Sequence, residues 1–235
     1  MQGVCYKPPR RRTRRRGRLA MLLLFSALFL VSCVAGSNAL WVRGFLGIDL
    51  VDYRAEQVEA TLPVEGALAD SLCDTVDLLT VNSTRLEPVS KSSSLIHFYR
   101  DELLNHLLRE GYSRYTGDAD AMEAVKKDYP GMTVSVLIPA ADLENLAQRY
   151  FGAQNIRHGD GELFTYLEKS GYYTFSMKAW EDSVTVVPES IEETHHTYRL
   201  HFHLQKGEEL SRGYVAIFVK RDDGSTYLRA LSYDQ

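Results

Sequence analysis

From Ser183 onward, this chain alternates between apolar and polar side chains with a period of two. Successive side chains of a β-strand point to opposite faces of a sheet, so this alternation is typical of strands with one buried face. It predicts four strands in an antiparallel meander, at residues 183–193, 197–206, 213–221 and 226–233. Gly224 suits a tight hairpin turn, whereas Pro188 predicts an edge position or a bulge for the first strand.

The preceding residues show the apolar spacing of amphipathic helices. Helices are predicted at 67–80, 95–110, 120–128 and 138–151, with a further short helix within 162–171 and a short strand at 132–137. Asp120 and Glu123 have the spacing of a capping box, while Gly111 and Gly152 suit helix ends. Helices followed by an antiparallel sheet indicate the α+β class. We therefore predict a single α+β domain over 67–235, helical in 67–151 and sheet in 183–233, with helices packed on one face of a curved sheet of four or more strands.

The helix at 138–151 and the four-stranded meander resemble, by their order, the cystatin-like, nuclear-transport-factor-like superfamily. This resemblance implies a sheet that wraps around a helix and leaves a conical pocket. The chain is also similar to uncharacterised lipoproteins of Gram-positive anaerobes. Neither resemblance implies a catalytic residue.

The N-terminus combines a strongly basic stretch with an apolar one. Residues 7–18 contain eight Lys and Arg residues, and the twelve residues 19–30 carry no charge. That length fits the core of a signal peptide better than the roughly 20 residues of a membrane-spanning helix. The next residues, Leu30-Val31-Ser32-Cys33, resemble the bacterial lipobox, which implies that Cys33 receives a lipid and becomes the first residue after cleavage. Residues 1–33 are thus predicted to be a lipoprotein signal peptide, and residues 34–66 a tether followed by a segment of ambiguous structure.

Two other outcomes are open for the N-terminus. Small residues at Ser37-Asn38-Ala39 suit an ordinary signal peptidase, which would release a secreted protein that begins at Leu40. Without cleavage, the apolar run would form a single-pass anchor with its arginines in the cytoplasm. Each outcome places residues 40–235 outside the cytoplasm, and the lipobox predicts a lipid-anchored protein on the outward face of the cell membrane.

Removal of the signal peptide makes the chain strongly acidic. The whole chain has 27 basic and 31 acidic residues, so 19 basic residues stand against 31 acidic ones after cleavage, a net charge of −12. Nucleic-acid binding requires clustered Lys and Arg, so we expect no nucleic-acid partner. Cys73 is the one cysteine outside the signal peptide, and its helical spacing with apolar residues predicts a small buried side chain.

Two polar segments contain candidate catalytic or metal-binding residues. Arg199, His201 and His203 are predicted to share one face of the 197–206 strand, where two imidazoles are able to hold zinc. The permanent charge of Arg199 disfavours a metal, so we predict a polar, solvent-facing surface with no metal or cofactor. The segment His158-Gly159-Asp160-Gly161-Glu162 offers acid and base groups, but its composition is more typical of a turn.

Six aromatic residues around the loop that follows the 138–151 helix form the candidate ligand cleft: Tyr150, Phe151, Phe164, Tyr166, Tyr172 and Tyr173. Tyrosine provides both contact area and a hydroxyl group, which suits ligand binding. No nucleophile, phosphate-loop or dinucleotide motif is present in the sequence, and we assign no catalytic residue. We therefore expect a non-catalytic domain that binds a small molecule, a peptide or an envelope protein. The alternatives are a metal-assisted enzyme that uses His201 and His203, and a structural component of an envelope complex.

Overall fold

The computed structural model describes residues 53, 55–81, 85–175 and 184–234. They belong to one compact unit, Tyr53–Gln235, which does not include Met1–Asp52. The predicted signal peptide, Cys33 and most of the predicted tether therefore lie outside the described residues. Within the described ranges, every helix is too short or too polar to cross a membrane.

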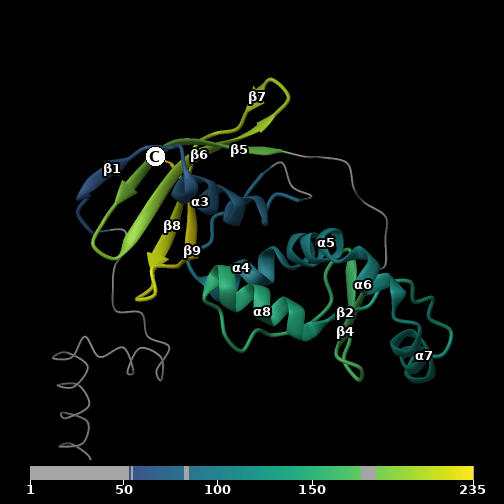
Figure 1. Ribbon diagram of the computed structural model, residues 1–235. Helices are drawn as coiled ribbons and strands as arrows, with labels where there is room; N and C mark the ends of the chain where they lie inside the picture. The colour runs from purple at the N-terminus through teal and green to yellow at the C-terminus, as the bar shows by residue number, and fades with distance from the viewer. Residues whose placement is uncertain (1–52, 54, 82–84, 176–183, 235) are drawn as a thin grey trace, which may run out of the picture. The chain divides into compact units, whose positions relative to one another are not determined.

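The unit has the predicted α+β architecture, organised around an antiparallel sheet that we call sheet A (Figure 1). Its strands are β1 (Ala60–Leu62), β5 (Thr185–Glu193), β6 (Thr197–Lys206), β7 (Glu209–Leu210), β8 (Tyr214–Lys220) and β9 (Thr226–Tyr233). Neighbouring strands follow the order β1, β5, β6, β8, β9, and β7 pairs with β6. The four predicted strands are confirmed, and the short strands β1 and β7 extend the sheet.

Strand β5 contains the irregularity predicted from its proline. The register between β5 and β6 shifts between Pro188 and Ser190, which marks a bulge. Strand β1 covers β5 only from Ile191 to Glu193, so among the described residues Pro188 pairs on the β6 side alone. Pro188 therefore lies at a bulge and on a locally unpaired edge of β5, as its lack of an N–H predicts.

Helices that precede β5 in the sequence cover the buried face of sheet A. Helix α3 (Ala67–Asp77) packs on β5, while α4 (Ser92–Phe98) and α8 (Ala140–Phe151) pack on β9. Their apolar side chains join Leu200, Phe202 and Leu228 of the sheet in one core. Gly152 ends α8 in the left-handed conformation, with φ of 59°, as its position in the sequence predicts.

The helical region between α3 and α8 differs from the prediction in three places. The expected helix at 95–110 is two helices, α4 and α5 (Arg100–Glu110), because the backbone leaves the helical conformation at Tyr99. The Tyr99 hydroxyl accepts a hydrogen bond from the Glu87 N–H and donates one to its carbonyl. Helix α6 (Tyr112–Gly117) forms in a segment for which no element was predicted. Helix α7 (Ala119–Asp128) is capped by Asp118, which accepts from the Ala121 N–H, so the predicted capping box at Asp120 is wrong.

A second sheet, sheet B, replaces the helix predicted within 162–171. It consists of β2 (Ile138–Pro139), β4 (Tyr172–Phe175) and β3 (Phe164–Leu167), in that order. Gly171, with φ of 71°, lies in the turn that joins β3 to β4, and its carbonyl accepts from the Ala140 N–H. The predicted strand at 132–137 is absent from the described structure, where only Ile138 and Pro139 pair as β2.

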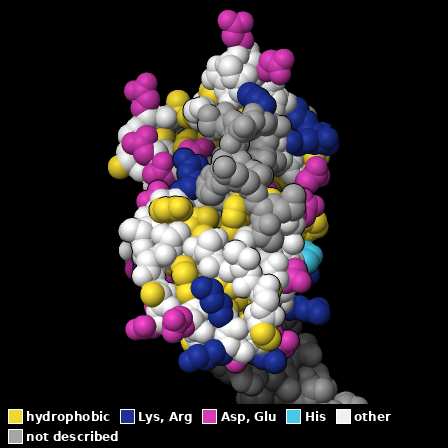
Figure 2. All heavy atoms as spheres, turned by 90° about the vertical axis from the view of Figure 1, so that its right-hand side faces the viewer, with side chains coloured by type: hydrophobic (Ala, Val, Ile, Leu, Met, Phe, Trp, Pro, Cys, Tyr) yellow, Lys and Arg dark blue, Asp and Glu magenta, His cyan; other side chains and the backbone are white. Residues whose placement is uncertain are grey.

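Charged side chains of both signs are interspersed with hydrophobic ones on the face drawn in Figure 2. The large hydrophobic residues that are most exposed come from separate segments of the chain: Val58, Phe98, Tyr112 and Leu210. Scattered apolar groups of this kind are normal on a soluble surface and do not by themselves indicate a partner.

Candidate functional site

The aromatic residues predicted to line a ligand cleft are divided between the core and the surface. Phe151, Phe164 and Tyr173 are fully buried in the main core. Strands β3 and β4 place alternate residues on this core, which is why Phe164 pairs with Phe175 and Tyr166 with Tyr173, with ring centroids 5.1 and 4.9 Å apart. Half of the proposed cleft residues thus have no exposed surface to offer a ligand.

The remaining three aromatic residues of the set are half-buried. Tyr150 and Tyr166 pack at the margin of the main core, and Tyr172 packs with Leu167 against the smaller core beneath α7. None of the six lines the pocket described below. They support the two cores and the loop between α8 and β3.

His158 fixes this loop through both of its ring nitrogens. Its Nε2 lies 2.8 Å from a carboxylate oxygen of Glu144, and its Nδ1 lies 3.0 Å from the Tyr173 hydroxyl. The imidazole also stacks on Tyr166, with centroids 5.0 Å apart. The nearby Asp160 accepts from the Tyr166 N–H. These contacts give the segment from His158 to Glu162 a structural role, consistent with the turn predicted there.

Arg100 and Asp101 hold the same loop from α5, a feature that the sequence analysis missed. The buried Arg100 guanidinium donates to the carbonyl oxygens of Arg157, Gly159 and Asp160 at 2.9 to 3.1 Å. Asp101 accepts from the backbone N–H groups of Glu162 and Leu163, at 2.6 and 3.2 Å. These two residues stand about sixty positions before the loop, so no local pattern links them to it.

The histidines of β6 lie on the polar face of the strand, as the alternation predicts. Arg199, His201 and His203 are partly exposed, while the intervening Leu200 and Phe202 are fully buried. The Nδ1 atom of His201 lies 3.1 Å from Asp234. The Nδ1 atom of His203 lies 2.7 Å from the Ser211 carbonyl oxygen, and its Nε2 lies 2.9 Å from Glu189.

These contacts determine the electrostatics of the polar face. The Ser211 carbonyl and then Glu189 raise the pKa of His203 above its ordinary value. Arg199 pairs with Glu192 at 3.3 Å, next to His201. Across the described residues, no three His, Cys, Asp or Glu side chains are grouped in a way that could hold a metal ion. The hypothesis of a metal-assisted enzyme at His201 and His203 gains no third ligand from the structure.

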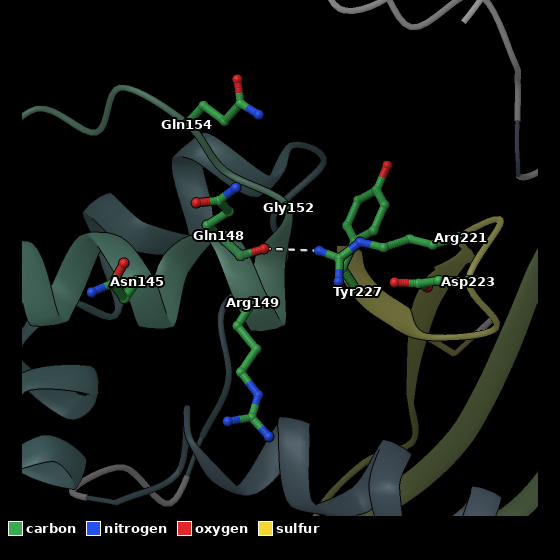
Figure 3. Close-up of a pocket in the computed structure, with 8 residues that line it drawn as sticks. All are labelled: Asn145, Gln148, Arg149, Gly152, Gln154, Arg221, Asp223 and Tyr227. Atoms are coloured by element: carbon green, nitrogen blue, oxygen red, sulfur yellow. Dashed lines mark hydrogen bonds between the residues drawn. The ribbon is translucent and has the colours of Figure 1, made fainter.

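A concavity lies elsewhere, between the C-terminal end of α8 and the hairpin that joins β8 to β9. We call it the α8–hairpin groove; it has a volume of about 520 Å³ and is open to solvent. Its lining residues are Asn145, Gln148, Arg149, Gly152, Gln154, Arg221, Asp223 and Tyr227. Figure 3 shows that the first five come from α8 and the residues after it, and the last three from the hairpin.

Two contacts join the walls of the groove. The Arg221 guanidinium reaches across it and donates to the Gln148 carbonyl oxygen at 2.8 Å (Figure 3). Gly152 packs directly against the Tyr227 ring, where a Cβ atom would lie only 2.8 Å from a ring carbon. Arg221 also lies over the Tyr227 ring, 5.1 Å from its centroid. Helix and hairpin are therefore held in a fixed relation without any ligand.

The lining of the groove is polar. Asn145, Gln148 and Gln154 are exposed, and their side-chain amides make no hydrogen bond to another described residue. Side-chain and backbone hydrogen bonds with Ser225, followed by the charge of Arg221, lower the pKa of Asp223. Both the glycine at 152 and the turn at 222–225 are visible in the sequence, but their juxtaposition depends on the packing of α8 on β9.

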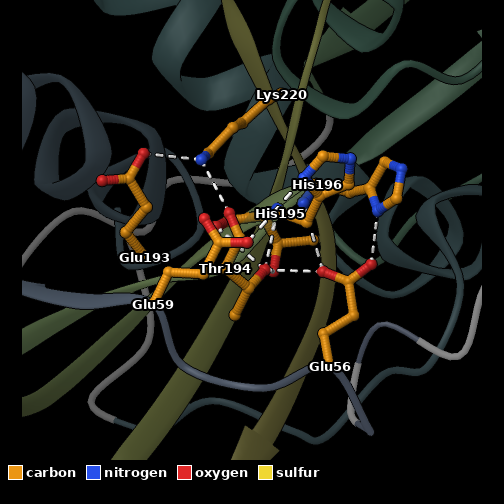
Figure 4. A network of polar contacts seen from close by, with 8 residues as sticks. Glu56, Glu59, Glu193, Thr194, His195, His196 and Lys220 are labelled. Carbon is orange, nitrogen blue, oxygen red and sulfur yellow. Dashed lines mark hydrogen bonds and ion pairs between the residues drawn. The ribbon is translucent and has the colours of Figure 1, made fainter.

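A second polar network, which we call the Glu56 clamp, fastens the start of the unit to sheet A (Figure 4). One carboxylate oxygen of Glu56 accepts from the Thr194 hydroxyl at 2.6 Å and from the His196 N–H at 3.2 Å. The other lies 2.6 Å from His196 Nδ1. Burial alone would raise the pKa of Glu56, but the hydrogen bonds from Thr194 and His196 outweigh it and hold the pKa below its ordinary value.

The surroundings of the clamp are also paired. Lys220 lies 2.6 Å from Glu193 and donates to the Thr194 carbonyl at 2.7 Å. Arg199 donates to the carbonyl oxygens of Tyr53 and Glu56 at 3.0 and 2.7 Å. Residues 53–59 thus form part of the folded unit, although the sequence analysis assigned them to the tether and the ambiguous segment.

Comparisons with protein-family models, with curated proteins and with solved structures found no match to this chain. The resemblances to the cystatin-like superfamily and to Gram-positive lipoproteins therefore stay predictions. The evidence on function is therefore the chemistry of the groove and the sequence of the N-terminus, because no relative of known function matches the chain.

Proposed function

We propose that this protein is a lipid-anchored, extracytoplasmic binding protein whose α+β domain recognises a ligand or envelope partner without catalysing a reaction. The basic stretch, the uncharged residues 19–30 and the sequence ending at Cys33 support the export and anchoring part of the proposal. The observation that carries the binding part is the α8–hairpin groove, whose two walls are joined by Arg221 and whose three amide side chains make no hydrogen bond to another described residue.

The chemistry of the groove supports binding better than catalysis. An efficient general acid or base needs a pKa near the working pH and a proton to exchange with the substrate. Asp223 has a lowered pKa and is already hydrogen-bonded to Ser225, so it is a weak base. The guanidinium of Arg221 is committed to Gln148 and Tyr227, while the amides do not ionise. These groups are suited to positioning a bound molecule.

Metabolic labelling of the full chain tests the anchor. In bacteria that process lipoproteins, we expect an alkyne-bearing palmitate to label the wild-type protein and to leave a Cys33→Ala variant unlabelled. Cys5→Ala is the matched control, because Cys5 lies before the uncharged stretch and is removed with the signal peptide. Mass spectrometry of the native protein should recover an N-terminal diacylated Cys33.

Three results would contradict the anchor. Recovery of an intact N-terminus in the membrane fraction would show that the protein is anchored by an uncleaved single-pass segment and not by a lipid. A soluble extracytoplasmic product that begins at Leu40 would show ordinary signal-peptide cleavage. Labelling that persists in Cys33→Ala would equally exclude Cys33 as the attachment site.

A further inference from the structure

We infer that the α8–hairpin groove binds a neutral saccharide, an assignment that rests on the proposed binding function and specifies its ligand class. The groove combines three features on one surface: a rigid floor, three amides that make no side-chain hydrogen bond to another described residue, and charged groups of both signs. Each feature narrows the chemistry of the molecule that fits.

The floor of the groove is formed before any ligand arrives. Tyr227 is held against Gly152, where no side chain intervenes, and Arg221 ties the hairpin to the last turn of α8. A preformed site loses less conformational entropy on binding than one that must be ordered by its ligand. Its volume of about 520 Å³ lies within the range of small-molecule sites.

The amides determine the hydrogen-bonding character of the groove. Each of Asn145, Gln148 and Gln154 offers two N–H donors and one carbonyl acceptor. A sugar hydroxyl also donates one hydrogen bond and accepts others, so it pairs with an amide in either orientation. A ligand with several adjacent hydroxyl groups is able to use all three amides at once, whereas an apolar ligand would leave them desolvated and unpaired.

The groove carries charges of both signs, two arginines and one aspartate. An anionic ligand would meet the ionised carboxylate of Asp223, and a cationic ligand would be repelled by Arg149 and Arg221. Arg221 is already engaged by the Gln148 carbonyl, the Ser225 hydroxyl and the Tyr227 ring. A neutral polyhydroxylated molecule avoids both conflicts and still receives hydrogen bonds from the guanidinium edge.

The openness of the groove sets the expected affinity. A ligand exposed to water on one side keeps part of its hydration and gains few desolvated contacts, so we expect a dissociation constant on the order of 0.1–1 mM. Ligand-observed saturation-transfer NMR detects binding in this range. The full chain should be solubilised in a detergent without a sugar headgroup, so that the micelle does not compete for the groove.

The probes are maltose and N,N′-diacetylchitobiose as neutral disaccharides, with glucose 6-phosphate, glucosamine and inorganic phosphate as charged comparisons. We expect at least one neutral disaccharide to bind and the charged probes to bind more weakly. The Asn145→Ala/Gln148→Ala double variant should weaken the binding about tenfold, because two hydrogen-bonding amides are lost. Gln57→Ala removes an exposed amide outside the groove and should leave the affinity unchanged.

Thermal melting separates loss of binding from loss of folding, since all three substituted side chains are exposed and the variants should melt with the wild type. Preferential binding of glucose 6-phosphate, with competition by inorganic phosphate, would show that the groove binds anions. This result would overturn the saccharide assignment but not the proposed binding function. Disaccharide signals that persist unchanged in the double variant, or absence of binding by every probe, would overturn the inference. Neither result affects the labelling of Cys33, which tests the anchor separately.

Discussion

The Glu56 side chain should contribute strongly to the stability of the folded unit, because it holds the Glu56 clamp together. The Glu56 side chain is only 14% exposed, and it accepts hydrogen bonds from the Thr194 hydroxyl and the His196 N–H. Substitution by alanine removes the acceptor and leaves these donors beside a small cavity. Thr194 is fully buried, so water cannot readily replace the lost oxygen at its hydroxyl.

The magnitude follows from the number and type of contacts. A hydrogen bond to a charged group contributes a net stabilisation of about 1.5–3 kcal/mol, but Thr194 keeps its contact with Thr197 and His196 is partly exposed, so the two contributions do not add in full. We therefore expect Glu56→Ala to lower the free energy of unfolding by about 2–3 kcal/mol. For a unit of this size, that corresponds to a fall of about 4–12 °C in the melting temperature.

The pH dependence has a defined sign. Because the pKa of Glu56 is lowered in the folded state, its stabilising effect is fully present above the ordinary value of 4.5 and is lost as the pH falls through the folded pKa. The difference between wild type and Glu56→Ala should therefore be largest near pH 7 and shrink toward pH 3. Thermal melts of the full chain monitored by circular dichroism at pH 7, 5 and 3 measure this difference.

Glu65→Ala is the matched control, because Glu65 is exposed and its loss should change the free energy of unfolding by less than about 0.5 kcal/mol. The reasoning is refuted if Glu56→Ala melts together with Glu65→Ala at pH 7. A constant difference across the three pH values would show that the loss comes from packing of the glutamate stem and not from its charge.

Three further substitutions test other parts of the unit. Burial first, and then the charges of Asp101 and Glu162, raise the pKa of Glu102 to about 7. Ionisation of Glu102 therefore destabilises the folded state as the pH rises from about 4.5 to 7. In denaturant titrations, we expect Glu102→Gln to raise the free energy of unfolding by about 1–2 kcal/mol at pH 8 and to leave it unchanged at pH 4. In the same assay, Gly152→Ala should lower the free energy of unfolding by about 1–3 kcal/mol, because residue 152 has a positive φ and the new Cβ atom would displace the Tyr227 ring. Arg100→Met should leave the backbone carbonyls of residues 157–160 without their donor, and hydrogen exchange at residues 157–163 should accelerate; unchanged protection there would exclude the anchoring role.

The elements predicted best from the sequence are those whose signal is local and strong. Strands β6 and β9 occupy the predicted bounds. Buried and partly exposed residues alternate from Arg199 to Gln205 of β6, whereas a register shift at Arg229 interrupts the alternation of β9. Helix α8 was predicted from its apolar stripe and from Gly152, which the structure shows in the left-handed conformation. In these segments, local preference and tertiary packing require the same conformation.

The segment at 162–171 shows where a local signal is insufficient. Leu163, Tyr166 and Leu167 have helical spacing, whereas Phe164 and Tyr166 have the spacing of a strand. The strand is formed because β4 pairs with it and both strands bury aromatic rings on the main core. A short segment with both patterns is decided by its partner, and the partner is not visible in the segment itself.

The candidate groove could not be predicted either, because each of its walls depends on a partner that is distant in the sequence. Its two walls are separated by about seventy residues, and the contact that joins them is between the side chain of Arg221 and a backbone carbonyl of Gln148. A carbonyl oxygen is present at every position, so it leaves no mark in the sequence. Aromatic residues are easy to recognise in a sequence, and the ligand cleft was therefore predicted at a set that includes Phe151, Phe164 and Tyr173. The structure shows that these three are core residues.

The folded domain begins earlier than predicted, for a related reason. Apolar periodicity placed its start at residue 67, but β1 pairs with β5, and carbonyl and carboxylate contacts fasten Tyr53 and Glu56 to the sheet. A three-residue strand and a polar clamp have no periodicity to detect. Polar contacts to backbone atoms thus join parts of this chain that are distant in sequence, both at the start of the domain and across the groove, and they add to the packing of the apolar core.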